Sequence, residues 1–299
     1  MIRSMTGYGR GEFASGERKF TAEIRSVNHR YNDITIKLPR GMAEFEDPVR
    51  KQLVKAITRG KTDVYIAFET FSRSDVTVKF NEPAADVLVE RLAAMKERYN
   101  TTDGVSLNVL TRFQDILSVD RTSFAEETKE ICLKCVAEAV GAALAGFTRM
   151  REEEGRSLAA DIGAKLKNIE ASLAAVTERA PLVPKLYREK LSQRIAELTA
   201  GANLNAAPDE TRLATEVLYF ADRACIDEEL TRLKSHISQM NKFLSETEAV
   251  GRKLDFLAQE MNREINTIGS KANDAEISSA VVEIKAELEK IREQIQNIE

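Results

Sequence analysis

Residues 250–298 read VGRKLDFLAQEMNREINTIGSKANDAEISSAVVEIKAELEKIREQIQNI, and this stretch decides the fold of the C-terminal part of the chain. Apolar residues recur in it every three or four positions: Val250, Leu254, Leu257, Met261, Ile265 and Ile268, then Ile277, Val281, Ile284, Leu288, Ile291, Ile295 and Ile298. Such steps place side chains on one face of a helix. The spacing predicts two consecutive helices, 250–268 and 275–298, which must pack against other helices to be stable.

The same periodicity continues upstream. Residues 226–244 carry a third apolar seam with steps of 3 and 4. Further helices are predicted over 84–99, 126–150 and 156–199, the last with a break at Pro181 and Pro184, while 100–124 is predicted as a loop-rich connector with a short helix and 200–209 as a turn. Most of the chain after residue 82 is therefore expected to be helical.

The first 80 residues have a different pattern. Alternating apolar and polar residues predict strands over 2–10, 18–27, 31–38 and 62–71, with a helix over 43–58. We therefore predict the α+β class: a small N-terminal α+β domain followed by a large, mostly α-helical region with long helical hairpins. The predicted segments are 1–81 for the N-terminal domain, 82–210 for a helical connector and long hairpin, and 211–299 for a C-terminal helical domain.

Composition narrows the class of protein. The chain has 299 residues, three cysteines and a net charge of −4. Residues 1–80 hold 15 Lys and Arg against 10 Asp and Glu, so the front of the chain is basic and the rest acidic. This asymmetry permits an anionic ligand, including nucleic acid, and is equally compatible with a solvated mixed surface. Few cysteines, no apolar leader after Met1 and no stretch approaching ~18 apolar residues favour a cytoplasmic protein without membrane contact.

Three short motifs argue against other chemistries. Cys132 and Cys135 form a CxxC inside a helical pattern with no second pair, which favours core packing over a zinc site. Gly60-Lys61-Thr62 ends like a phosphate-binding loop but joins a helix to a strand, the reverse of the order that aims backbone amides at phosphate. Gly7, Gly9 and Gly11 follow no strand. No nucleotide cofactor is expected.

Polar residues flank the seam of the 250–268 helix. One flank has Arg252, Asp255, Gln259, Asn262 and Asn266, and the other has Glu260, Arg263 and Thr267. A merely solvated face would be built of Glu and Lys, because Asn and Thr are poor helix formers. Three amides in register suit directional hydrogen bonds to a polar ligand or a buried network. We favour a functional or interface role over plain solvation.

Each of the two histidines belongs to a further group of polar residues. Glu229, Arg232 and His236 run along the edge of the 226–244 seam, where an interfacial salt-bridge row is the simpler interpretation. Arg25-Ser26-Val27-Asn28-His29-Arg30-Tyr31 lies at a break between two predicted strands and offers phosphate and base contacts together. An ordinary polar turn is the simpler interpretation there as well.

Several long motifs resemble the YicC family (the YicC/YloC group). They are MIRSMTGYGRGE, EIRSVNHRYNDITIKLP, EAVGRKLDFLAQEMNREINTIGSKANDAEIS and the ending VVEIKAELEKIREQIQNIE, so the resemblance covers essentially the whole chain. Asn32 departs from the family pattern, in which an apolar residue follows HRY. The resemblance implies an endoribonuclease that acts on single-stranded or structured RNA with a divalent metal, Mn²⁺ or Mg²⁺. It also implies a ring-like homo-oligomer, a hexamer, that encloses RNA.

Two mechanisms fit the matching motifs. In the first, Glu229, His236, Asp255, Glu260 and Glu264 would supply catalytic groups, with Glu229, His236, Glu260 and Glu264 as metal ligands; in the simpler interpretation these carboxylates pair with Arg232, Arg252 and Arg263. In the second, His29 and His236 act as general base and acid on the ribose 2′-hydroxyl and leave a 2′,3′-cyclic phosphate. In either mechanism the RNA-binding residues would be Arg3, Arg25, Asn28, Arg30, Tyr31, Arg232, Arg252, Gln259, Asn262, Arg263, Asn266 and Lys271.

A non-enzymatic interpretation remains open. A helical scaffold or RNA-binding adaptor could use the same polar stripes as assembly contacts. The absence of a compact acid–base motif such as HExxH slightly favours it. A substitution that abolishes cleavage and leaves the oligomer intact would separate the two classes.

Overall fold

The structure, a computed structural model, describes residues 2–72, 75–100, 106–113, 115–120, 126–201, 209–246 and 250–299. These residues group into two compact units. The sheet unit comprises residues 7–148, and the helical unit comprises residues 2–6 together with Arg149–Glu299. This grouping differs from the three segments predicted from the sequence, which stay a prediction.

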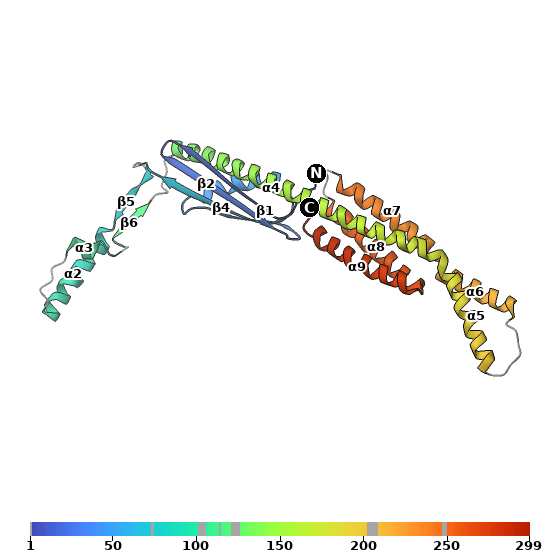
Figure 1. Ribbon diagram of the computed structural model, residues 1–299. Coiled ribbons are helices and arrows are strands. Elements are labelled where there is room, and N and C mark those ends of the chain that lie inside the picture. Colours follow the sequence, from blue (N-terminus) through green and yellow to red (C-terminus); the bar gives the residue numbers. More distant parts are fainter. Residues whose placement is uncertain are drawn as a thin grey trace. The chain divides into compact units, whose positions relative to one another are not determined.

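The sheet unit is built on a four-stranded mixed sheet with the order β1–β2–β4–β3 (Figure 1). The strands are β1 (Gly7–Ser15), β2 (Arg18–Val27), β3 (Asn32–Lys37) and β4 (Gly60–Thr70). β2 is antiparallel to both β1 and β4. β3 is parallel to β4 because helix α1 (Glu46–Ala56) carries the chain back between them.

One face of this sheet forms a core with α1 and with the first part of α4 (Glu126–Arg179). Phe20, Ile24 and Val64 point into it from the strands, as the alternation in β2 and β4 predicts. Cys132 and Cys135 are buried in the same core, so the core interpretation of the CxxC is confirmed.

The predicted strand 2–10 is wrong in its first half. Residues 2–6 belong to the helical unit, where Ser4 forms a β-bridge with Ile298. The strand instead continues to Ser15, and its glycines have a packing role: a Cβ on Gly9 would lie 2.1 Å from the carbonyl oxygen of Ala143 in α4. Gly9 thus allows the helix backbone to approach the strand backbone.

Residues 75–120 add a small substructure to the sheet unit that the sequence analysis missed in part. β5 (Thr77–Phe80) and β6 (Leu117–Asp120) form a separate two-stranded antiparallel sheet, and neither strand was predicted. Between them in sequence lie α2 (Glu82–Tyr99) and α3 (Leu107–Leu110), which correspond to the predicted helix 84–99 and the short helix of the connector.

Helix α4 is longer than predicted. The expected interruption at 151–155 is wrong, because the helix runs unbroken to Arg179 and Gly155 packs against the backbone of Ile2. The break at the prolines is present as a 3₁₀ turn, Ala180–Leu182, which leads into α5 (Val183–Gly201). The predicted turn 200–209 lies mostly outside the described residues.

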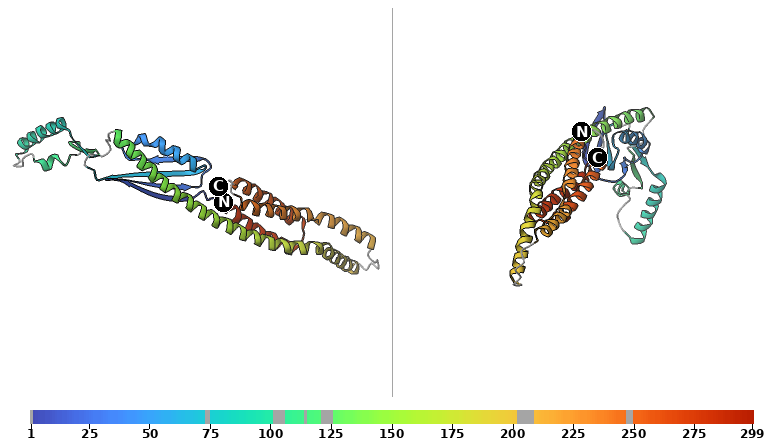
Figure 2. Two further views of the ribbon diagram at one scale, coloured as in Figure 1. Left: turned by 90° about the horizontal axis from the view of Figure 1, so that it is seen from above. Right: turned by 90° about the vertical axis from the view of Figure 1, so that its right-hand side faces the viewer.

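The helical unit contains the last part of α4 with α5, α6 (Glu210–Ala224), α7 (Asp227–Leu244), α8 (Gly251–Lys271) and α9 (Ala275–Ile295) (Figure 2). The predicted apolar seams meet in its core, with Leu233, Met261 and Ile291 fully buried. Arg151 closes one end, since it donates to the carbonyl oxygen of Ser4 and pairs with Glu299. A mixed four-stranded sheet followed by long helices confirms the predicted fold class.

One helix comes closer to a membrane span than the sequence analysis predicts. Residues 128–199 contain an 18-residue window with a mean hydropathy of 1.6, so this helix is long and apolar enough to cross a membrane. The expectation that no stretch approaches that composition is wrong by this measure. Core helices have the same property, and α4 buries Val136, Ala139 and Val140 completely against the sheet.

Candidate functional site

Two ion pairs connect α7 and α8. Glu229, in the first turn of α7, accepts a 2.7 Å hydrogen bond from Nζ of Lys271 at the end of α8. Further along α7, a guanidinium nitrogen of Arg232 lies 3.6 Å from a carboxylate oxygen of Glu264, and Arg232 also pairs with Glu228. Glu229 and Glu264 are only 7% and 5% exposed. The simpler interpretation, in which these carboxylates pair with cations, therefore holds for Glu264, whose partner is Arg232. Glu229 also pairs with a cation, but its partner is Lys271.

The environment shifts the protonation of the first pair. Burial, the largest single influence, would raise the pKa of Glu229, but the hydrogen bond from Lys271, a backbone hydrogen bond and the charges of Lys271 and Arg232 together outweigh it, and the pKa lies below its usual value. The hydrogen bond to Glu229 raises the pKa of Lys271. Both groups are thus charged at neutral pH. The second carboxylate oxygen of Glu229 is buried and has no partner in the described part of the chain.

His236 follows these pairs along the same side of α7. The pairs Glu229–Lys271 and Arg232–Glu264 set an antiparallel register, which puts His236 at the level of Glu260 on α8. The two side chains form no ion pair among the described residues. Nδ1 of His236 is buried and lacks a hydrogen-bond partner there.

The outward face of α8 carries the amides that the sequence analysis singled out. The side-chain amide of Gln259 donates to Asp255 at 2.9 Å, and the amide of Asn266 donates to Asn262 at 3.3 Å. These residues line an open groove of about 360 Å³, whose walls are Gln259, Asn262, Arg263, Asn266, Thr267 and Arg292. We call it the amide groove. Five of the six groove residues, all except Arg292, belong to the polar flanks that the sequence predicts on the 250–268 helix. Four of these five are amides or arginines.

Arg292 is a groove residue that the sequence analysis missed. It comes from α9, the helix that the apolar seam predicted over 275–298. Its Nε is buried without a hydrogen-bond partner among the described residues, while a terminal nitrogen pairs with Glu289 at 3.0 Å. An Arg directly after the seam residue Ile291 was the available signal. Together with Arg263 it gives the groove two cations.

The predicted metal ligands do not form a metal site within one chain. Among the described residues, no group of three or more His, Cys, Asp or Glu side chains lies close enough to hold an ion. Glu229 and Glu264 are engaged by Lys271 and Arg232. Arg252 and Arg263, by contrast, have no ion-pair partner in the described ranges, so the proposed pairing of carboxylates with these two arginines is not seen.

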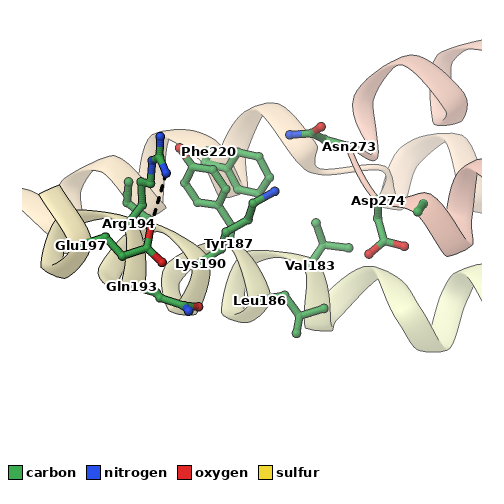
Figure 3. Close-up of a pocket in the computed structure, with 12 residues that line it drawn as sticks. Val183, Leu186, Tyr187, Lys190, Gln193, Arg194, Glu197, Phe220, Asn273 and Asp274 are labelled. Carbon is green, nitrogen blue, oxygen red and sulfur yellow. Dashed lines mark hydrogen bonds and ion pairs between the residues drawn. The ribbon is translucent and has the colours of Figure 1, made fainter.

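A second, larger cavity of about 720 Å³ lies between α5, α6 and the turn before α9 (Figure 3). Tyr187 and Phe220 stack in it with ring centroids 3.7 Å apart. Asp274 lies at its edge, where it caps α9 and pairs with Arg179. None of the site residues predicted from the sequence lines this cavity, so it is a separate feature of the helical unit.

The remaining predicted residues lie elsewhere. His29 and Tyr31 form a tight turn after β2, in which Nδ1 of His29 accepts from the Tyr31 amide at 3.3 Å. Arg25 and Arg30 lie over the rings of Tyr8 and Tyr31, each about 5.5 Å from the ring centroid. Asn28 belongs to the same turn.

This turn is in the sheet unit, whereas His236 is in the helical unit. Arg3 is also in the helical unit and pairs with Glu152 at 2.9 Å. Asn32, the departure from the expected apolar residue, donates its side-chain amide to the carbonyl oxygen of Ile57 at 2.9 Å and so fits its surroundings.

The comparisons with known proteins agree over the whole chain. The model described as "Endoribonuclease YicC-like, N-terminal region" matches residues 2–160, and "Endoribonuclease YicC-like, C-terminal" matches residues 176–299. The chain belongs to the YicC-like endoribonuclease family. It is 41% identical to a Clostridioides difficile protein and 32% identical to a Haemophilus influenzae protein, over the full length of both chains in each case; each is named "Probable endoribonuclease YicC". The family's C-terminal region contains α5 to α9, and with them the amide groove.

Proposed function

We propose that this YicC-family protein is an endoribonuclease that cleaves RNA phosphodiester bonds and contacts its substrate through the amide groove. The observation that carries the proposal is the groove itself, in which Gln259, Asn262 and Asn266 lie beside Arg263 and Arg292. Guanidinium groups suit phosphate oxygens, and amides suit base edges and ribose hydroxyls. The full-length match to proteins named as endoribonucleases supports RNA as the substrate.

The chemistry proposed for the chain's own residues centres on the α7–α8 seam. His236 lies on this seam at the level of Glu260, as the pairs Glu229–Lys271 and Arg232–Glu264 set the register. In a metal-free reaction, a base removes the proton of the ribose 2′-hydroxyl, the 2′-oxygen attacks phosphorus, and an acid protonates the departing 5′-oxygen. The products are a 2′,3′-cyclic phosphate and a 5′-hydroxyl. His236 and His29 remain the proposed acid–base pair for this reaction.

Assistance by Mn²⁺ or Mg²⁺ rests on the family resemblance. The carboxylates of one chain do not fit such an ion, because Glu229 and Glu264 already neutralise cations. We therefore assign no step to a metal. Glu260 and Asp255 are the two predicted catalytic carboxylates without an ion-pair partner in the described ranges, and they are the groups to test for a metal requirement.

We also propose that the protein acts as a cytoplasmic homo-oligomer, with a hexamer as the expected state. The family resemblance supports this. An oligomer that encloses RNA would place several amide grooves around one substrate, which strengthens binding by raising the effective concentration of each groove.

The decisive experiment is cleavage of a labelled RNA by the purified protein with Mn²⁺, Mg²⁺ or EDTA, followed by analysis of the product ends. The variants are Glu260→Gln and His236→Ala, with Lys285→Ala as a matched surface control on α9. Cleavage that survives EDTA, leaves cyclic phosphate and is lost in His236→Ala supports the metal-free reaction. Cleavage abolished by EDTA and by Glu260→Gln, with 3′-hydroxyl ends, supports a metal site. RNA that is bound but never cleaved would refute the enzyme and leave an RNA-binding adaptor.

A further inference from the structure

The two-stranded sheet β5–β6 has one face made only of apolar side chains. Val78 lies opposite Val119, and Phe80 lies opposite Leu117. Directly opposed residues of an antiparallel pair project from the same face, so these four side chains form a continuous surface, here called the hairpin face. Val78, Phe80 and Val119 are 60%, 59% and 56% exposed.

The chain itself provides little to stabilise this substructure. Among the described residues 75–120, Ala85 and Ile116 are the buried apolar side chains. A two-stranded sheet is marginal in water unless further strands or a packed layer cover it. In the described part of the chain, neither β5 nor β6 pairs with a further strand, so each is an edge strand.

The substructure exposes several large apolar side chains. Phe80, Tyr99 and Phe113 are about half exposed and together present on the order of 300 Å². Val78 and Val119 of the hairpin face add to this surface, and Val76, Val87, Met95 and Leu107 are exposed on other parts of the same substructure. Monomeric proteins seldom leave so much apolar surface uncovered.

We propose that the hairpin face is a subunit interface, covered by the same substructure of a second copy of this chain. The hairpin face needs a partner that is present whenever the chain itself is present. A second copy of the chain meets this requirement. Two hairpins related by a two-fold axis bury Val78, Phe80, Leu117 and Val119 against each other, and the same patch serves both copies.

This inference rests on the homo-oligomer proposed above and identifies one of its contact surfaces. The test measures the mass of the full-length protein by sedimentation for the wild type, Val119→Lys and Val282→Lys. Val282 is the matched control, a valine that is 67% exposed on α9 in the helical unit. We expect Val119→Lys to reduce the mass at least two-fold with an unchanged circular dichroism spectrum, and Val282→Lys to retain the wild-type mass.

A second measurement, on the wild type, tests the proposal even if Val119→Lys fails to fold. Hydrogen exchange of the wild type is followed at high and low protein concentration, and we expect peptides containing β5 and β6 to lose protection as the oligomer dissociates. Two results would overturn the hairpin interface alone. One is a wild-type mass for Val119→Lys, and the other is hydrogen-exchange protection in β5 and β6 that does not change when the oligomer dissociates. A wild type that is monomeric throughout would overturn the homo-oligomer as well. Neither result bears on RNA cleavage, which the product-end assay tests separately.

Discussion

Lys271 and Glu229 lie 42 residues apart in sequence, and their side chains join the end of α8 to the start of α7 through a 2.7 Å hydrogen bond. Glu229 is buried, whereas Lys271 remains partly exposed. The buried carboxylate of Glu229 therefore has its charge balanced by the partly solvated ammonium group of Lys271. It closes the seam along which Arg232, Glu264 and His236 are arranged, so its loss is expected to affect both stability and the proposed site.

Removing the cation leaves a buried carboxylate without a partner. We expect Lys271→Met to lower the free energy of unfolding by about 1 kcal/mol, a value reduced from that of fully buried pairs because Lys271 is partly solvated. Urea denaturation at pH 7 measures the change. Lys285→Met is the control, since Lys285 is exposed on α9 and has no ion-pair partner among the described residues. Equal stabilities of the two variants would contradict the prediction.

The same pair predicts a pH dependence. The folded-state pKa of Glu229 is lowered by Lys271 despite burial, so the stabilisation is present above the ordinary carboxyl pKa and is lost as the pH falls through the folded-state value. The difference in unfolding free energy between the wild type and Lys271→Met should shrink as the solution is acidified from neutrality. A difference that stays constant down to the lowest pH at which both proteins fold would show that the charge on Glu229 is not involved.

The arginines of the amide groove should contribute to RNA binding through phosphate contacts. Arg263→Ala and Arg292→Ala are each expected to weaken binding of a single-stranded RNA and to reduce the slope of log affinity against log salt by about 0.7. Fluorescence anisotropy across a salt series measures both quantities. Arg212→Ala serves as the control, because Arg212 is an exposed arginine of α6 outside the groove. An unchanged slope in both groove variants would remove the groove from the binding surface.

The three thiols should differ in reactivity. Burial raises the pKa of Cys132 to about 11 and also raises the pKa of Cys135, whereas Cys225 is exposed. Because the thiolate is the reactive form, the native protein should react with a disulfide reagent at one thiol and the denatured protein at three. Cys225→Ser should abolish the native reaction. Rapid native reaction of two or more thiols would show that the sheet unit's core opens readily.

Two glycines should respond to alanine with opposite signs. Gly9→Ala places a Cβ 2.1 Å from the backbone of α4, so strand or helix must shift and the sheet unit should be destabilised by roughly 1–3 kcal/mol. Gly163→Ala meets nothing within 4 Å inside α4 and should stabilise the helix by about 1 kcal/mol. Thermal unfolding of both variants gives the comparison. A neutral Gly9→Ala would show that β1 and α4 are not in close contact.

Much of the fold could be predicted because its signals are local. Apolar spacing in residues 226–298 placed α7, α8 and α9 within a few residues of their observed ends, and alternation located β2, β3 and β4. The errors arose where a neighbour supplies the stabilisation. Gly155 lies inside a continuous helix whose backbone packs against Ile2, and β5 and β6 pair only with each other among the described strands.

The sequence by itself determined the α+β class, the helical seams and the amide stripe on α8, because burial on one face of a helix or strand leaves a period that can be read from the residues. Only the tertiary structure decided which faces meet. It paired Glu229 with Lys271 and Glu264 with Arg232, and it brought Arg292 from α9 to the groove. These contacts join residues that are 25 or more positions apart, and no local period specifies them. The physical reason is that packing selects the partner helix, whereas spacing selects only the face that it contacts.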